Sequence, residues 1–121
     1  MARPSRKSNP VLHRTVSSLR QVSREHGSAV WRTLAERLEG SRRNWAEVNL
    51  SRVARYAKPN ETLAIPGVLL AAGTVTFPVR IAAFRASATA RQKVEAAGGH
   101  VLDLPALAGQ VPKGTGVRIL G

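Results

Sequence analysis

The stretch PNETLAI, residues 59–65, marks the point at which the pattern of the chain changes. The proline and asparagine at its start are residues that end helices, and the chain before them has apolar residues at every third or fourth position. From Glu61 onward the apolar residues alternate with others, as they also do in VRIAAF, residues 79–84. The sequence therefore predicts a helical half over residues 11–58 and a strand-rich half over residues 61–121.

Three helices are predicted in the first half, each with a recognisable start or end. The first follows the capping residue Asn9 and ends at Gly27, and the second runs from Ser28 to Gly40. The third follows Asn49, which we expect to cap it. The residues predicted to face the core are Val11, Leu12, Val16, Leu19 and Val22 in the first helix, Val30, Trp31, Leu34, Ala35 and Leu38 in the second, and Leu50, Val53, Ala54 and Ala57 in the third.

The second half is predicted to contain strands separated by one helix and one helical turn. The helix covers SATARQKVEAAGG, residues 87–99, and a strand HVLD, a helical turn LPALAG and a last strand GVRIL follow it. The order of these elements predicts an α/β fold with a three-helix segment and a small, mostly irregular sheet. Residues 11–121 are expected to form one globular domain, preceded by a basic flexible arm over residues 1–10.

The chain is strongly basic, since 19 Lys and Arg against 7 Asp and Glu give a net charge of +12. Fifteen of the nineteen cations are arginines. A guanidinium group stays charged at any physiological pH and binds a phosphate with two hydrogen bonds at once. The segment RLEGSRRNWAEVNLSRVARY, residues 37–56, contains five arginines but only two carboxylates, too few to pair with them. An anionic partner, namely nucleic acid, is therefore predicted for this segment.

The candidate RNA contacts are spread over the arm, the helices and the strand-rich half. For a surface arginine or lysine the alternative is a solvated side chain without a partner. Asn44 could simply turn the chain, and Trp45 could either stack on an unpaired base or cover the core. Trp31 and Tyr56 lie on or beside apolar stripes and are predicted to be packed. The candidate RNA-binding residues are Arg3, Arg6, Lys7, Arg14, Arg20, Arg24, Arg37, Arg42, Arg43, Asn44, Trp45, Arg52, Arg55, Arg80, Arg85 and Lys113.

Four segments carry a resemblance to a known family. They are, in order along the chain, AERLEGSRRNWAEVNLSRVARYA, ETLAIPGVLLAAG, VRIAAFRASATARQKVEAAGG and GVRIL. In this order and spacing they resemble the archaeal and eukaryotic large-subunit ribosomal protein family called eighteen-e, whose C-terminal module is shared with the fifteen family of the same subunit. The resemblance covers about residues 11–120. It implies a structural protein of the cytoplasmic ribosome that binds and stabilises folded large-subunit ribosomal RNA, beside neighbouring ribosomal proteins. It also implies that the N-terminal three-helix segment packs on a C-terminal module of short, irregular strand-strand-helix turns.

The chain departs from that family in one turn, where PGVLLAAG replaces a sequence of the type PGKVLGSG. Val68 stands in place of the usual lysine, so no phosphate contact is expected from the side chain at this position. Ala71 stands in place of the first later glycine, which predicts that the backbone there has no positive φ.

Catalytic and metal-dependent functions find little support in the sequence. The chain has no cysteine, and its three histidines are scattered without the spacing of metal ligands. No carboxylate pair lies in an apolar setting, nothing resembles a nucleophile elbow, and the glycine-rich segments lack the spacing of a phosphate-binding loop. We therefore predict no enzyme activity, no metal, no cofactor and no small-molecule substrate.

Two alternatives to a ribosomal role fit these features less well. A free-standing nucleic-acid-binding regulator would use the second and third helices as a helix-turn-helix, but their linker of about eight or nine residues exceeds the usual turn. A membrane-surface protein would need free amphipathic helices, whereas these helices need their apolar residues for packing. The apolar run over residues 63–77 is too short to span a bilayer, and no apolar segment of a signal peptide follows the basic N-terminus. We expect a soluble protein.

Overall fold

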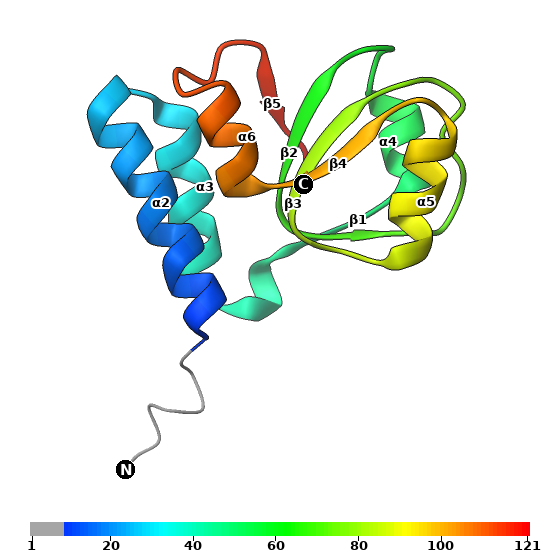
Figure 1. The fold of residues 1–121 in the computed structure, drawn as a ribbon. Helices are drawn as coiled ribbons and strands as arrows, with labels where there is room; N and C mark the ends of the chain where they lie inside the picture. The colour runs from blue at the N-terminus through cyan, green and yellow to red at the C-terminus, as the bar shows by residue number, and fades with distance from the viewer. Residues whose placement is uncertain (1–8) are drawn as a thin grey trace.

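The computed structural model describes residues 9–121, which form five α-helices and one five-stranded sheet (Figure 1). Arg3, Arg6 and Lys7 of the predicted arm lie outside the described residues. The helices are α2 (Pro10–His26), α3 (Ala29–Glu39), α4 (Leu50–Tyr56), α5 (Ala88–Ala96) and α6 (Leu104–Gln110), with a 3-10 turn η1 (Arg42–Asn44). The strands are β1 (Ala46–Asn49), β2 (Thr62–Leu70), β3 (Arg80–Ala86), β4 (His100–Asp103) and β5 (Val117–Ile119).

All strand pairs of the sheet are parallel. The strands follow the order β1-β2-β3-β4, and β5 pairs with β2 as well. β5 pairs with the first half of β2 and β1 with its second half, on the edge opposite to β3. The predicted α/β class is confirmed. The five strands form one parallel sheet, with a register shift between β2 and β3 at Ile65–Val68.

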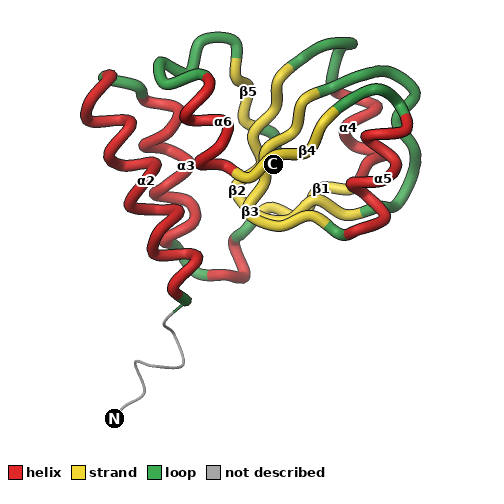
Figure 2. The backbone as a smooth tube through the Cα atoms, in the orientation of Figure 1, coloured by secondary structure: helices red, strands yellow, loops and turns green. Residues whose placement is uncertain are grey.

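Helices cover both faces of this sheet, as a parallel sheet requires. Figure 2 shows α2, α3 and α6 on one side and α4 and α5 on the other. The core under α2, α3 and α6 includes Leu19, Trp31, Leu34, Leu38, Ala64, Ala82, Leu104 and Leu107. The core under α4 and α5 includes Val48, Leu50, Val53, Leu63, Ile65, Leu69, Ile81 and Val94.

Strand β1 occupies residues that the sequence predicted to be a loop. It is only four residues long, and its alternation of buried Ala46 and Val48 with more exposed neighbours is too brief to stand out from a loop. Its partner β2 continues through Pro66 and Gly67, where the register with β3 shifts. A Cβ atom at Gly67 would lie 2.1 Å from the Ala46 carbonyl oxygen, so the close approach of β1 requires glycine here.

The helix ends agree with the sequence in two cases and differ in a third. Asn9 caps α2, since its Oδ1 accepts hydrogen bonds from the backbone N–H groups of Val11 (3.0 Å) and Leu12 (3.2 Å), and the positive φ of Gly27 (65°) ends this helix. Asn49 precedes α4 but makes no side-chain cap. Its Oδ1 accepts instead from the N–H of Ala72 (3.1 Å), which fastens the turn after β2 to the start of α4.

That turn also tests the expectation for residue 71. Among the described residues, the one non-glycine residue with a positive φ is Asn60, so Ala71 has none, as predicted. The positive φ of the turn lies at Gly73 (92°), whose added Cβ would come within 2.8 Å of Ser51. The ammonium group of Lys93 donates to the carbonyl oxygens of Ala71 and Gly73, both at 2.9 Å, and holds the turn from α5.

Two side chains that were predicted to be packed are exposed instead. Val11 is 52% exposed and Tyr56 is 51% exposed. Each lies in a terminal turn, Val11 in the first turn of α2 and Tyr56 in the last turn of α4. The apolar periodicity continues to the end of a helix, but the neighbouring element does not extend to cover these positions. Trp31, in the middle of α3, is fully buried as predicted.

Candidate nucleic-acid interface

A concavity lined by three arginines lies where η1 leads into β1. Its volume is about 360 Å³, and we call it the arginine hollow. It is lined by Arg42, Arg43, Trp45, Glu47, Val68 and Arg85. Four of these six were candidates from the sequence. Glu47 and Val68 were not candidates, because it is the pairing of β1 with β2 that brings them into the hollow, and this pairing was not predicted.

The floor of the arginine hollow is a row of three residues from three neighbouring strands. Glu47 of β1 pairs with Val68 of β2, and Val68 pairs with Arg85 of β3. The residues next to them, Val48 and Leu69, belong to the core under α4 and α5. Since successive side chains of a strand point to opposite faces, Glu47 and Val68 face the side of the sheet that carries α2 and α3, and Arg85 lines the same hollow. The hollow lies on a part of this sheet face that the helices do not cover.

Trp45 forms one wall of the arginine hollow and also covers the core. Its Nε1 donates a hydrogen bond to the Leu38 carbonyl oxygen (3.1 Å), and its ring meets Phe84 edge to face, with centroids 5.2 Å apart. The guanidinium carbon of Arg42 lies 5.1 Å from the centre of the Trp45 ring. Of the two alternatives left open by the sequence, the structure supports the cover over the core.

Within the described part of the chain, no ion pair neutralises the cations of the hollow. Arg42, Arg43 and Arg85 are exposed, and Glu47 is the one carboxylate in the lining. Among residues 9–121, ion pairs join Arg20 to Glu39 and Arg118 to Glu61, and no ion pair joins Glu47 to an arginine. The hollow therefore has three free guanidinium groups for an external anion.

The other candidate residues lie on separate surfaces. Arg52 and Arg55 line a hollow of about 450 Å³ on α4 with Ser51 and Tyr56, and the Arg52 guanidinium lies 5.9 Å from the Tyr56 ring centre. Because α4 covers the opposite face of the sheet, the structure does not bring this pair together with Arg42 and Arg43 (Figure 1).

A third polar surface lies on α2, where a hollow of about 410 Å³ is lined by His13, Arg14, Ser17, Ser18 and Gln21. Arg24 is exposed in the last turn of the same helix. Ser17, Ser18 and Gln21 were not candidates from the sequence. The candidates were recognised by an excess of positive charge, and these three side chains are uncharged.

Several candidates already have partners or stand apart from these hollows. Arg20 pairs with Glu39 and so links α2 to α3, and the hydrogen bond to Glu39 raises the pKa of this guanidinium. Arg80 donates to the side-chain oxygen of Gln110. The remaining candidates, Arg37, Asn44 and Lys113, are half-buried or exposed and line none of the three hollows described above.

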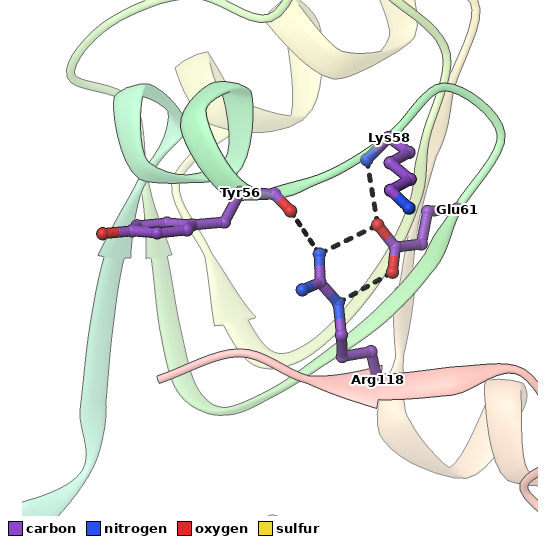
Figure 3. Close-up of polar contacts among 4 residues, drawn as sticks. All are labelled: Tyr56, Lys58, Glu61 and Arg118. Carbon is purple, nitrogen blue, oxygen red and sulfur yellow. Dashed lines mark hydrogen bonds and ion pairs between the residues drawn. The ribbon is translucent and has the colours of Figure 1, made fainter.

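Arg118, which the sequence did not single out, has a structural role (Figure 3). Its guanidinium makes two contacts with the Glu61 carboxylate, at 2.7 and 2.9 Å, and donates to the carbonyl oxygen of Tyr56. The backbone N–H of Lys58 donates to the same carboxylate at 2.9 Å. The cluster thus joins β5 to the segment between α4 and β2.

We expect this cluster to make a small, pH-dependent contribution to the free energy of unfolding. Burial raises the pKa of Glu61, but the hydrogen bonds from Lys58 and Arg118 outweigh it, so the pKa lies below its ordinary value. A carboxyl group with a lowered folded-state pKa stabilises the fold above its unfolded pKa, and this stability is lost as the pH falls through the folded value. At neutral pH, Glu61→Gln should cost at most about 1 kcal/mol, because Arg118 is nearly half exposed.

Urea unfolding of wild type and Glu61→Gln at pH 7 and pH 3 measures this term. The difference between the two proteins should shrink at pH 3. Glu95→Gln, an exposed change outside the ion pairs of residues 9–121, controls for the loss of one negative charge. An equal difference at both pH values would show that Glu61 acts by packing alone.

Residues 9–121 offer neither a metal site nor a membrane span. No three histidine, aspartate or glutamate side chains of this part gather in a way that could hold a metal ion. None of its helices combines the length and the apolarity needed to cross a membrane.

Comparison with known proteins gives one consistent result. The family model described as "Ribosomal protein 60S L18 and 50S L18e" matches residues 1–121. Proteins named large ribosomal subunit protein eL18 from Methanoregula boonei and Archaeoglobus fulgidus are each 43% identical, over 120 and 115 residues. These alignments cover 99% and 95% of the chain and 99% and 98% of the relatives. The protein of the same name from Halobacterium salinarum is 40% identical over 114 residues, 94% of the chain and 97% of its own length.

Proposed function

Since the chain belongs to the family of ribosomal proteins 60S L18 and 50S L18e, we propose that its arginine hollow binds the phosphate backbone of large-subunit ribosomal RNA. The family membership confirms the resemblance found in the sequence. It makes the chain a structural constituent of the large subunit of the cytoplasmic ribosome and not an enzyme. RNA binding would stabilise the folded RNA around the protein, and neighbouring ribosomal proteins would be further partners.

The observation that carries this proposal is the set of unpaired guanidinium groups around one concavity. Arg42, Arg43 and Arg85 come from η1 and β3, and β1 with its neighbours holds the distance between them. Such groups bind phosphate oxygens in pairs, and RNA places phosphates close together along its backbone. A rigid concave surface orders fewer side chains on binding than a mobile segment does.

The surfaces on α2 and α4 support contacts of the same kind at other points of the RNA. Arg14 and Arg24 would serve on one side of the molecule and Arg52 and Arg55 on the other. Such an arrangement suits a protein that lies between RNA segments. The same proposal extends to Arg3, Arg6, Lys7, Arg20, Arg37, Asn44, Arg80 and Lys113, and Trp45 contributes by holding Arg42 in place.

A free-standing nucleic-acid-binding regulator, the alternative from the sequence, has less support. In a helix-turn-helix the two helices are joined by a short turn and pack on one another. Here η1 and β1 stand between α3 and α4, and these two helices lie on opposite faces of the sheet (Figure 2).

Salt dependence tests the proposed phosphate contacts. We expect the affinity for deproteinised large-subunit ribosomal RNA to fall log-linearly with salt, with a slope of about −0.7 to −0.9 per phosphate neutralised. Arg85→Ala should make the slope shallower by about one such step, because it removes one contact. The matched change Arg32→Ala, at an exposed arginine of α3 outside the hollows, should leave the slope unchanged. A slope that is flat in the wild type would contradict the proposal.

A further inference from the structure

Glu47 is the residue of the arginine hollow that phosphate binding does not explain. It lies in the floor, in register with Val68, which stands between it and Arg85, and it pairs with no arginine of residues 9–121. A carboxylate repels phosphate, so in a site built only for phosphates it would weaken binding. In a site that also receives a base, the same carboxylate can accept hydrogen bonds from the amino and imino groups of that base.

The other lining residues suit a base as well. Val68 offers an apolar patch between the two charged residues of the row. The guanidinium of exposed Arg42 lies over the Trp45 ring, and a planar guanidinium is also a group on which an unpaired base can stack. The volume of about 360 Å³ is within the range of about 300–1,000 Å³ that small-molecule sites have.

We propose that the arginine hollow receives one unpaired guanine nucleotide of the RNA. Its N1–H and N2–H donate to the two oxygens of Glu47, its O6 accepts from an arginine of the hollow, and its phosphate lies against the remaining guanidinium groups. Guanine is the base that presents two adjacent donors to a carboxylate. Uracil presents one donor between two carbonyl oxygens, which a carboxylate repels. This inference rests on the proposed function and adds to it the recognition of one base.

The sign of the effect of Glu47→Gln separates base recognition from phosphate binding. Base recognition predicts a loss of affinity for large-subunit ribosomal RNA of at least about five-fold, the lower end of what a bidentate base contact contributes. Phosphate binding alone predicts a gain, since a repulsive charge is removed. Glu95→Gln changes the net charge equally and lies on α5, which covers the opposite face of the sheet. It measures the effect of charge alone.

The two tryptophans give a second, direct readout. Trp45 lines the hollow, and Trp31 is buried in the core with its Nε1 bonded to the Val111 carbonyl oxygen (3.0 Å). In an amide NMR spectrum, millimolar 5′-GMP should shift the indole signal of Trp45 and leave that of Trp31 in place. UMP and inorganic phosphate should shift Trp45 much less, and Glu47→Gln should reduce the shift caused by 5′-GMP.

The outcomes distinguish this inference from the proposed function. If Arg42→Glu with Arg43→Glu abolishes RNA binding while Glu47→Gln strengthens it, the hollow binds phosphates only, and the guanine site is overturned. Equal shifts of Trp45 with 5′-GMP, UMP and phosphate overturn it too. If neither the arginine changes nor Glu47→Gln alters RNA binding, the proposed function of the hollow fails together with the guanine site.

Discussion

Changing Arg42 and Arg43 together to glutamate should abolish incorporation of the protein into large ribosomal subunits. Both side chains are exposed at η1 and stand at the rim of the arginine hollow. The double change turns two attractions into two repulsions beside RNA phosphates. Its effect on stability should be small, about 0.5 kcal/mol per site or less, because neither side chain takes part in the core.

Sedimentation with large subunits at physiological salt and a melting curve measure the two effects separately. Arg14→Glu with Arg24→Glu is the matched control, since it makes the same change in charge on the exposed face of α2. We expect this control to weaken incorporation less. Normal incorporation of the Arg42 and Arg43 variant would show that the hollow is not a principal RNA contact. The binding face would then have to be sought on α2 or among Arg3, Arg6 and Lys7.

The sequence predicted the helices and most of the strands because their signals are local. Asn9 and Gly27 bound α2 through contacts within the helix itself, and Ser87 caps α5 by accepting from the Ala90 N–H at 3.1 Å. The alternation in VRIAAF predicted that Ile81 and Ala82 lie on opposite faces of a strand, and the structure places them in two different cores. Each of these features can be recognised from residues within one turn or one strand.

The arrangement of the sheet could not be predicted in the same way. β1 is four residues long and is a strand because it pairs with residues about twenty positions later in β2. Asn49 would cap α4 in isolation, yet its side chain bonds to Ala72, which the sheet brings beside it. Pairings at such separations leave no periodic signal in the sequence.

The candidate site was predicted by charge but not by shape. Arg42, Arg43 and Arg85 were recognised as cations, and nothing in the sequence placed Arg85 beside the other two. Their meeting depends on the registers of Glu47 with Val68 and of Val68 with Arg85. For the same reason Arg52 and Arg55, which are near Arg43 in sequence, belong to a different surface. Between Arg43 and Arg52 the chain passes through β1 and into α4, and so from one face of the sheet to the other.

Trp31→Ala should destabilise the fold far more than the changes at Glu61 or at Arg42 and Arg43. Trp31 lies on α3, and its side chain is fully buried in the core that α3 shares with α2 and the sheet. Its indole N–H donates to the Val111 carbonyl oxygen, 80 residues away, at 3.0 Å. Truncation of a buried tryptophan costs about 3–5 kcal/mol through lost burial and the cavity it leaves. Since domains of this size have only about 5–15 kcal/mol of stability, the melting temperature should fall by more than about 10 °C.

Two further variants assign this loss to its causes. Trp31→Phe keeps a buried ring but leaves the Val111 carbonyl without its donor, so it should cost about 1–3 kcal/mol, less than alanine. Val11→Ala, on the stripe that the sequence also assigned to the core, should cost under about 0.5 kcal/mol because Val11 is 52% exposed. Urea unfolding of the three variants gives the comparison. A cost of Val11→Ala as large as that of Trp31→Phe would contradict the exposure of Val11. Below their melting temperatures all three should bind ribosomal RNA like the wild type, since neither Trp31 nor Val11 lines the arginine hollow.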